Sequence, residues 1–231
     1  MTAQQSKPIP DGLIEYLRTV DTPTLSNAVE ELSVRPRTEG FAPLSIRCLF
    51  PEFGRMTGFA VTAQVETMTQ MGTRAAPRFH ELFEAIHNCP KPAIVVLQEI
   101  GAHRDYAAHT GEIMATISQR LGAIGIVSDC GVRDIPEVRA LKMHYFARGA
   151  VASHAHYRVV AAGEPVQIEG MVVQPGDVLH GDENGLMVVP NCDWEALKKA
   201  VDKVRSTERA LLEYVRGDTF TMDGLRQRFL H

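Results

Sequence analysis

The sequence predicts an α/β fold with a parallel βαβ core, followed by a compact β-layer and a C-terminal helix. Two continuous apolar runs, at residues 93–97 and 124–127, are typical of strands that a parallel sheet buries on both faces. An amphipathic helical pattern separates them, which indicates a right-handed crossover. Beyond residue 149, short apolar segments alternate with turn residues, a pattern typical of a small β-layer or barrel. Because no linker interrupts the chain, residues 1–231 are predicted to form one domain.

The first part of the chain is expected to place helices ahead of the sheet. Asp21 and Pro23 mark the start of a helix, since aspartate caps helices and proline fits their first turn. Prolines and glycines make residues 35–57 mostly loop. The expected elements are two helices within 11–33, a short strand at 45–50, a strand at 58–65 and a helix at 77–88.

A second βαβ unit follows the apolar run at 93–97. Its helix has one apolar face and ends near Gly122, a suitable C-cap; the face consists of Ile113, Met114, Ile117 and Leu121. The strand at 124–127 is expected to lead through a tight turn at 129–134 into a short helix at 136–141 and a third strand at 144–147.

The remainder is predicted to be short strands and a long helix. The strands are expected at 159–160, 165–168, 171–173, 178–179 and 186–189. Residues 193–231 form a C-terminal helical extension, with its long helix at 193–216. Glu208 occupies one position of the apolar seam of that helix, where a charge is costly unless it is paired.

Composition excludes several classes of protein. The net charge of −4 gives no basic surface for nucleic acid. No apolar run approaches the roughly 18 residues of a membrane helix, and the polar residues 1–10 lack the apolar segment of a signal peptide. The four cysteines are scattered along the chain, at Cys48, Cys89, Cys130 and Cys192. We therefore expect no disulfide framework, and we expect a reducing, cytoplasmic location.

Three charged residues lie where an α/β protein keeps its chemistry. Glu112 begins one helix, and Arg133 and Asp134 follow the next strand. Taken singly, Asp134 fits a helix cap, Arg133 a surface ion pair and Glu112 a first-turn acid. Together they lie beyond the carboxyl ends of neighbouring strands, where open α/β sheets bind ligands.

The same residues suit metal-assisted chemistry on a small carboxylate. Asp134 can anchor a hard ion such as Mg²⁺, which keeps several waters, and Glu112 can hold one of those waters. Arg133 offers a planar fork to a carboxylate or an enolate oxygen. The helix N-terminus can bind a carboxylate through the backbone amides of Gly111, Glu112, Ile113 and Met114. A 2-oxo acid would satisfy all of these groups.

The spacing of these residues resembles a family signature. Twenty residues separate Glu112 from Arg133-Asp134, and Glu137 follows after two more. This is similar to the Gly-Glu/Asp, Arg-Asp, Glu/Asp signature of the RraA-like class II pyruvate aldolases, which include 4-hydroxy-4-methyl-2-oxoglutarate (4-carboxy-4-hydroxy-2-oxoadipate) aldolase. The segments at 129–134, 175–177 and 181–190 resemble other elements of the family, and together the likeness covers most of residues 20–190.

The resemblance implies a swivelling ββα-type domain, a homotrimer or hexamer, and Mg²⁺ or Mn²⁺ as cofactor. It implies cleavage of a 4-hydroxy-2-oxo acid to pyruvate and a second carbonyl compound, with oxaloacetate decarboxylation as a side activity. Asp134 would then ligate the metal, Arg133 would bind substrate and stabilise the enolate, and Glu112 would position the catalytic water. The amides of residues 111–114 would bind the pyruvyl carboxylate.

The chain also departs from the family pattern. Cys130 replaces a glycine, and the loop at 101–109 is not a short glycine-rich one, which bears on the second half of the substrate. The aldolases take an acidic side chain from a neighbouring subunit's C-terminal helix, and Glu208 is the candidate here; pairing with Arg205 or Arg209 is the alternative.

Other functions stay open at the level of sequence. Some relatives are named for inhibiting an RNA-degrading endonuclease, so a non-enzymatic protein-binding regulator is the alternative to an aldolase. His154 and His156, with His144 and His180, could suggest a zinc hydrolase, although surface or loop histidines are the simpler interpretation. Cys130 could be a nucleophile, but the sequence identifies no base for it.

Overall fold

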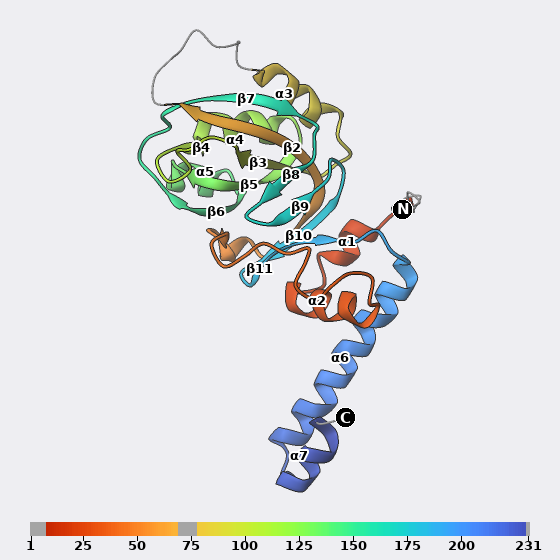
Figure 1. Cartoon of the computed structure of the whole chain (residues 1–231). Coiled ribbons are helices and arrows are strands. Elements are labelled where there is room, and N and C mark those ends of the chain that lie inside the picture. The colour runs from red at the N-terminus through yellow and green to blue at the C-terminus, as the bar shows by residue number, and fades with distance from the viewer. Residues whose placement is uncertain (1–7, 69–77, 230–231) are drawn as a thin grey trace.

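The computed structural model describes residues 8–68 and 78–229 (Figure 1). The α/β body carries the helices α3 (Phe79–Asn88), α4 (Glu112–Arg120) and α5 (Ile135–Ala140). Helices α1 (Leu13–Leu17) and α2 (Thr22–Glu31) lie between this body and α6 (Trp194–Arg216), which extends away from it and ends beside α7 (Met222–Phe229). Residues 1–7, 69–77 and 230–231 lie outside the described residues, and the first of these ranges holds most of the polar segment 1–10.

A mixed sheet of nine strands forms the body, in the order β1-β6-β5-β3-β2-β10-β11, with β4 beside β5 and β7 beside β2. Strands β2, β3, β5 and β6 run parallel, as the sequence predicts, and β7 and β10 are antiparallel to β2. The sheet strands are β1 (Arg47–Cys48), β2 (Met56–Met68), β3 (Ala93–Glu99), β4 (Ala108–Thr110), β5 (Ala123–Val132), β6 (His144–Ala150), β7 (His156–Ala162), β10 (Val178–Asp182) and β11 (Gly185–Val189). Strands β8 (Val166–Ile168) and β9 (Met171–Val173) form a separate hairpin.

The sheet is buried on both faces, which explains the continuous apolar runs. Val95 and Leu97 of β3 pack with the side chains of α3, α4 and α5. Ile94 and Val96 point to the other face and pack against the β8–β9 hairpin. A third cluster joins α1, α2 and α6 to β10 and β11. Apolar side chains are therefore needed at every position of a central strand.

The helix start predicted at Asp21 is confirmed, because its carboxylate accepts a hydrogen bond from Thr24 N at 2.9 Å. The turn predicted at 129–134 is wrong in its first half, since β5 continues to Val132. The polar residue Asp129 stays in the strand because its Oδ1 accepts the amide of Glu99, at 2.7 Å. Neighbouring strands β4 and β6 pair with this extension of β5.

The apolar faces of two helices differ from prediction. Ile113 of α4 is 75% exposed, and the residues that the helix buries are the small Ala115 and Ser118, which let it approach the sheet closely. The seam of α6 is buried only in its first half, at Leu197, Val201 and Val204. Its second half leaves the body, so Val215 is 42% exposed. Among the described helices, none combines the length and apolar character that crossing a membrane requires.

Two buried histidines make stability depend on pH. His180 is fully buried with Nδ1 2.9 Å from Thr57 Oγ1, and burial lowers the pKa of both His180 and His144 to about 4. The unfolded chain binds these protons near pH 6.5, so each histidine's contribution is complete above that pH and is lost as pH falls toward 4. A full shift of this size corresponds to about 3 kcal/mol per histidine. Burial raises the pKa of Asp129 to about 6 and also raises the pKa of Asp177, and both carboxyls change stability in the opposite direction, by less than the two histidines together.

We therefore expect the free energy of unfolding, measured in urea, to fall between pH 7.5 and pH 5.0. The variant His180→Gln cannot take up the proton and should show a smaller fall over the same interval. Equal stability of the native protein at both pH values would contradict this account, as would an unchanged slope in the variant.

Candidate functional site

The predicted site residues meet at the carboxyl edge of the parallel strands. Arg133 and Asp134 follow β5, and Gly111 follows β4. The amide of Arg133 donates to Thr110 O at 3.0 Å, which ties these two strand ends together. Residues more than twenty positions apart in the sequence are therefore neighbours in space.

Asp134 caps a helix, but not the one that the sequence suggests. It has a left-handed backbone conformation with φ +56°, and its side chain makes no capping hydrogen bond to α5. Its Oδ2 instead accepts the amide of Glu112, at 2.9 Å, and so caps α4. A side chain on Gly111 would collide with this oxygen, so glycine is required there for the approach. The N-terminus of α4 thus holds a carboxylate in this structure.

Arg133 lies beside the same carboxylate. Its Nε is 3.8 Å from Asp134 Oδ2, and the side chains of both residues remain more than a third exposed. Glu112 is also exposed. The first hydrogen bond within α4 runs from Ala115 N to Gly111 O, so the amides of residues 112–114 point out of the helix start. These features bring together an arginine, two carboxylates and backbone donors on an open edge.

Buried hydroxyls lie behind this edge. Tyr145 is fully buried, and burial raises its pKa to about 12, with the Asp134 charge contributing to the rise. Burial likewise raises the pKa of Tyr157 to about 12, against the opposing effect of Arg133. In Tyr145, a side-chain hydrogen bond with Thr110 acts against this rise. The tyrosines and Thr110 therefore form a buried polar layer behind the edge that carries Asp134.

Asp134 fits a magnesium or manganese ion. Mg²⁺ is usually held by one or two carboxylates and keeps several waters. Asp134 offers a hard oxygen at a partly exposed position, and the exposed Glu112 adds a second acid at the same edge. The donors present suit an oxygen-liganded ion with open positions.

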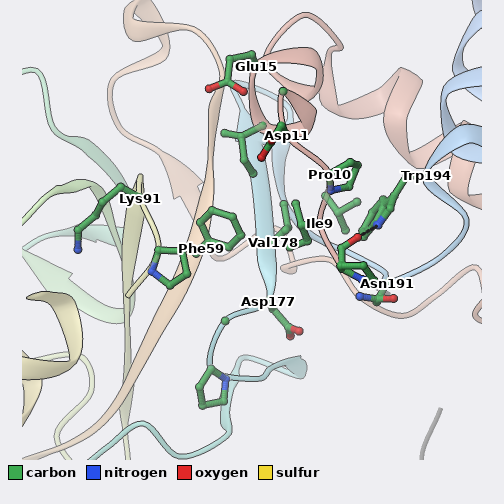
Figure 2. A pocket seen from close by; sticks show the side chains of 17 residues that line it. Ile9, Pro10, Asp11, Glu15, Phe59, Lys91, Asp177, Val178, Asn191 and Trp194 are labelled. Atoms are coloured by element: carbon green, nitrogen blue, oxygen red, sulfur yellow. Dashed lines mark hydrogen bonds between the residues drawn. The ribbon is translucent and has the colours of Figure 1, made fainter. Parts of the chain in front are cut away.

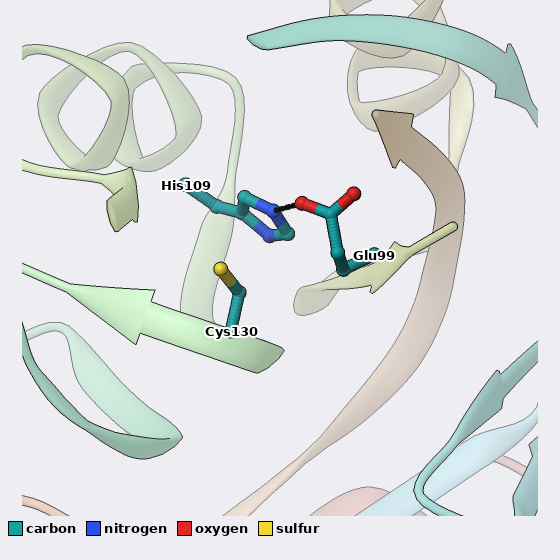
Figure 3. A group of neighbouring side chains, drawn as sticks. All are labelled: Glu99, His109 and Cys130. Carbon is teal, nitrogen blue, oxygen red and sulfur yellow. Dashed lines mark hydrogen bonds and ion pairs between the residues drawn. The ribbon is translucent and has the colours of Figure 1, made fainter. Parts of the chain in front are cut away.

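A second group of donor atoms lies deeper in the body (Figure 3). Glu99, His109 and Cys130 are buried, and within the described part of the chain they are the one set of three metal-ligand side chains whose donor atoms lie within 4.8 Å of one another. The protein already uses these atoms, however. Burial raises the pKa of Cys130 to about 12, and its Sγ lies 2.9 Å from the carbonyl oxygens of Arg104 and Ala107. That environment opposes the thiolate that a metal needs, so we interpret the group as a hydrogen-bonded network.

The sequence predicts neither Glu99 nor His109 as site residues. Glu99 ends an apolar strand. His109 closes the segment 101–109, which the sequence predicts as loop but whose last two residues belong to β4. The available signal was a polar residue at the end of a buried strand. That loop is held by ion pairs: Arg104 Nη1 contacts Glu169 at 2.8 Å, and Arg148 contacts both Glu169 and Asp105 at 2.8 Å.

The zinc interpretation gains no support from the described residues. His154 and His156 are both exposed. His154 Nδ1 contacts the carbonyl oxygen of Ala155. Neither residue belongs to a cluster of potential metal ligands in the described ranges.

Two cavities lie on opposite sides of the body. The first, of about 640 Å³, lies near the amino end of β3 (Figure 2) and is lined in part by Ile9, Asp11, Glu15, Phe59, Lys91, Asp177 and Trp194. The second, of about 570 Å³, lies at the carboxyl end of β2 beside the 101–109 loop and is lined by Thr67, Met68, His103, Tyr106, Ser153, Ala155 and His156. Only the second is on the edge that carries Arg133 and Asp134.

Glu208 lies on α6, away from α4 and α5 (Figure 1). Its Oε1 accepts a hydrogen bond from Asn27 Nδ2 at 3.2 Å. It lines a groove together with Arg205, Arg209 and Arg216. Any part that it plays at the Arg133–Asp134 site would therefore have to be in another copy of the chain.

Comparisons with known proteins agree with this architecture. A solved structure of an uncharacterized protein from Pseudomonas syringae pv. tomato str. DC3000 has a TM-score of 0.76 and 24% identity, and the match covers 99% of both chains. Streptomyces coelicolor RraAS2, described as an unusual member of the RNase ES inhibitor RraA protein family, has a TM-score of 0.66 and 24% identity over 88% of this chain and 96% of that one. At these identities the likeness shows the fold.

Sequence comparisons give two relatives of different length. A Halalkalibacterium halodurans protein named "Putative 4-hydroxy-4-methyl-2-oxoglutarate aldolase" is 24% identical over 94% of this chain and 95% of its own. Protein DlpA of Legionella pneumophila is 26% identical over 87% of this chain, but the match spans only 31% of DlpA. The profile of the RraA-like family, described as Aldolase/RraA, matches residues 22–188. The chain therefore belongs to the RraA-like family.

Proposed function

We propose that this protein is a divalent-metal-dependent lyase that cleaves a 4-hydroxy-2-oxo acid to pyruvate and a second carbonyl compound. The observation that carries the proposal is the meeting of Arg133, Asp134 and the N-terminus of α4 at one sheet edge, with Asp134 Oδ2 2.9 Å from Glu112 N. A chain that only binds another protein has no need of this combination. The H. halodurans relative named as an aldolase supports the same class of reaction.

Asp134 would hold Mg²⁺ or Mn²⁺, and Glu112 would hold one of the water molecules bound to that ion. When bound, such an ion supplies Lewis-acid polarisation of the substrate's 2-oxo group. An ion on Asp134 would lie beside the amides proposed to bind the substrate, because the Asp134 carboxylate accepts a hydrogen bond from the first amide of α4.

The amides of residues 111–114 would bind the substrate carboxylate. Helix N-termini favour anions, and this one already accommodates the carboxylate of Asp134. Arg133 would donate hydrogen bonds from its planar guanidinium to the oxygen that becomes the enolate oxygen. Negative charge grows on this oxygen as the C–C bond breaks. Glu112, exposed at the helix start, would position the water that exchanges a proton with the second product.

The same groups would decarboxylate oxaloacetate. The bond between C3 and the departing carboxylate breaks, its electron pair forms the enolate of pyruvate, and carbon dioxide leaves. A proton then adds to the enolate carbon to give pyruvate. The half of an aldol substrate that becomes the second carbonyl compound would extend toward the cavity beside His103, Tyr106 and His156.

A homotrimer or hexamer would complete the site. The second half of α6 and the helix α7 form a C-terminal arm that leaves the body and carries exposed apolar side chains. The exposed fractions are 46% for Leu212, 42% for Val215 and 59% for Met222. A second copy that covers this arm would bury them, and it could bring Glu208 toward a neighbour's Asp134.

The direct test is release of pyruvate from oxaloacetate by the full chain with Mg²⁺. We expect turnover above the rate of free Mg²⁺, loss of that turnover with excess chelator, and recovery when Mn²⁺ or Mg²⁺ is returned. Turnover that persists in chelator would contradict the metal requirement.

The alternative is a non-enzymatic regulator that binds an RNA-degrading enzyme. The likeness to S. coelicolor RraAS2, a protein assigned to an RNase ES inhibitor family, favours it. Absence of turnover on oxaloacetate and on 4-hydroxy-2-oxo acids, with inhibition of an RNase E-type nuclease, would establish this alternative instead.

A further inference from the structure

A buried chain of hydrogen bonds crosses the carboxyl ends of four adjacent strands. Thr67 of β2 donates through its amide and its hydroxyl to Glu99 at the end of β3. His109 of β4 places Nε2 2.9 Å from Glu99 Oε2 (Figure 3) and Nδ1 3.0 Å from Ser128 Oγ in β5. All four side chains belong to residues that are at most 4% exposed.

The donors and acceptors in this hydrogen-bond network match one another. Glu99 accepts hydrogen bonds from Thr67, Gly101 N and His109, which together lower its pKa to about 2 despite its burial. The carboxylate requires a proton on His109 Nε2. Ser128 Oγ accepts the amide of Cys130 at 3.1 Å, so its own proton is available to Nδ1. His109 therefore bridges Glu99 and Ser128 through its two ring nitrogens.

We propose that His109 is a positioning residue, and that the Glu99–His109–Ser128 relay holds the N-terminus of α4 in register with Arg133 and Asp134. The inference rests on the function proposed above. Strand β4 has three residues and pairs with β5 alone in the described sheet, and His109 is its one large side chain. Two residues beyond His109, the chain enters the Gly111–Glu112 segment that meets Asp134.

The expected consequence of breaking the relay is a small displacement with a large effect. Strand β4 would keep its backbone pairing to β5 but lose the side chain that ties it to β3. Misplacement of reacting groups by about 1 Å can cost on the order of 10²-fold in rate. The relay itself never touches the substrate, because His109 is fully buried.

The test compares His109→Phe with His109→Gln in the full chain. Glutamine can still donate an N–H to Glu99, whereas phenylalanine cannot. Per folded molecule, we expect the kcat for pyruvate release from oxaloacetate with Mg²⁺ to fall at least tenfold in His109→Phe and to stay within about threefold of the native value in His109→Gln. The control His180→Gln, which alters another fully buried histidine, should leave the rate unchanged.

Amide hydrogen exchange gives a readout that does not need activity. In metal-free His109→Phe, the amides of Glu112 and Arg133 should exchange at least tenfold faster, because their acceptors are Asp134 Oδ2 and Thr110 O. Amides in α6 should keep native protection. Native exchange at Glu112 and Arg133, with a native rate per folded molecule, would overturn the proposal.

Two further outcomes remain decisive. If His109→Phe does not fold, Ser128→Ala removes the Nδ1 partner of His109, together with the acceptor of the Cys130 amide, and leaves the Glu99 contact in place. Native rates and native exchange in that variant would overturn the positioning role. If the native protein releases no pyruvate, the proposed function fails, and the exchange of Glu112 and Arg133 alone decides whether His109 positions this edge.

Discussion

Replacing Asp134 by asparagine is expected to remove metal-dependent turnover while leaving the fold intact. The loss should be on the order of 10³-fold, since the anchor of an ion that supplies several kcal/mol to the transition state is gone. Asparagine keeps an oxygen for the amide of Glu112 and tolerates the left-handed φ of +56°. Alanine should lose the same activity and, in addition, about 1 kcal/mol of capping energy.

The measurement has two parts, pyruvate release from oxaloacetate and Mn²⁺ binding followed by electron paramagnetic resonance. Asp134→Asn should fail in both while its thermal unfolding stays close to native. Asp193→Asn is the matched control, because Asp193 caps α6 through the amides of Glu195 and Ala196. A near-normal rate in Asp134→Asn, or equal loss in Asp193→Asn, would remove Asp134 from the mechanism.

The same aspartate shows what local sequence patterns can and cannot predict. That Asp134 follows a buried strand can be predicted, because a strand buried on both faces needs a continuous apolar run. The partner of its carboxylate cannot, because the amide that it accepts lies 22 residues earlier in the chain. The capping motif in the sequence predicts that Asp134 caps the helix that follows it, α5. The left-handed backbone at Asp134 is not accompanied by such a hydrogen bond.

The missed end of β5 has a similar cause. Asp129 and Gly131 have low strand propensity, so the pattern favours a turn. The strand continues because β4 and β6 pair with it on both sides and because Asp129 has two partners: Glu99 N donates to its Oδ1, and Arg104 Nη2 lies 3.3 Å from its Oδ2. Strand β4 itself is too short to show any periodicity. Contacts between distant segments decide both cases, and one sequence alone does not contain that pairing.

Glu99 and His109 escaped prediction for the same reason. They are ten residues apart, and the loop between them returns His109 to the end of the strand that Glu99 closes. Each looks ordinary on its own: an acid after an apolar run and a histidine in a loop. Their burial and their shared hydrogen bond become apparent only when β4 is placed beside β5.

Replacing Arg133 by lysine should lower kcat on the order of 10²-fold without weakening metal binding. Lysine keeps the charge but replaces a planar set of donors with a single hydrated point, so the developing enolate loses directed hydrogen bonds. Arg133 Nε is 3.8 Å from Asp134 Oδ2, which makes the pair a loose one and leaves the guanidinium able to turn toward a substrate.

Steady-state kinetics with oxaloacetate, together with Mn²⁺ titration, separate Arg133 from Asp134. Arg133→Lys should bind Mn²⁺ as the native protein does and lose rate, whereas Asp134→Asn should lose both. Arg120→Lys, on the exposed last turn of the same helix α4, is the control for an arginine-to-lysine change near the site. If Arg133→Lys turns over within a few-fold of native, the enolate is not stabilised by this guanidinium. The charge would then have to be carried by the metal and the amides of α4 alone.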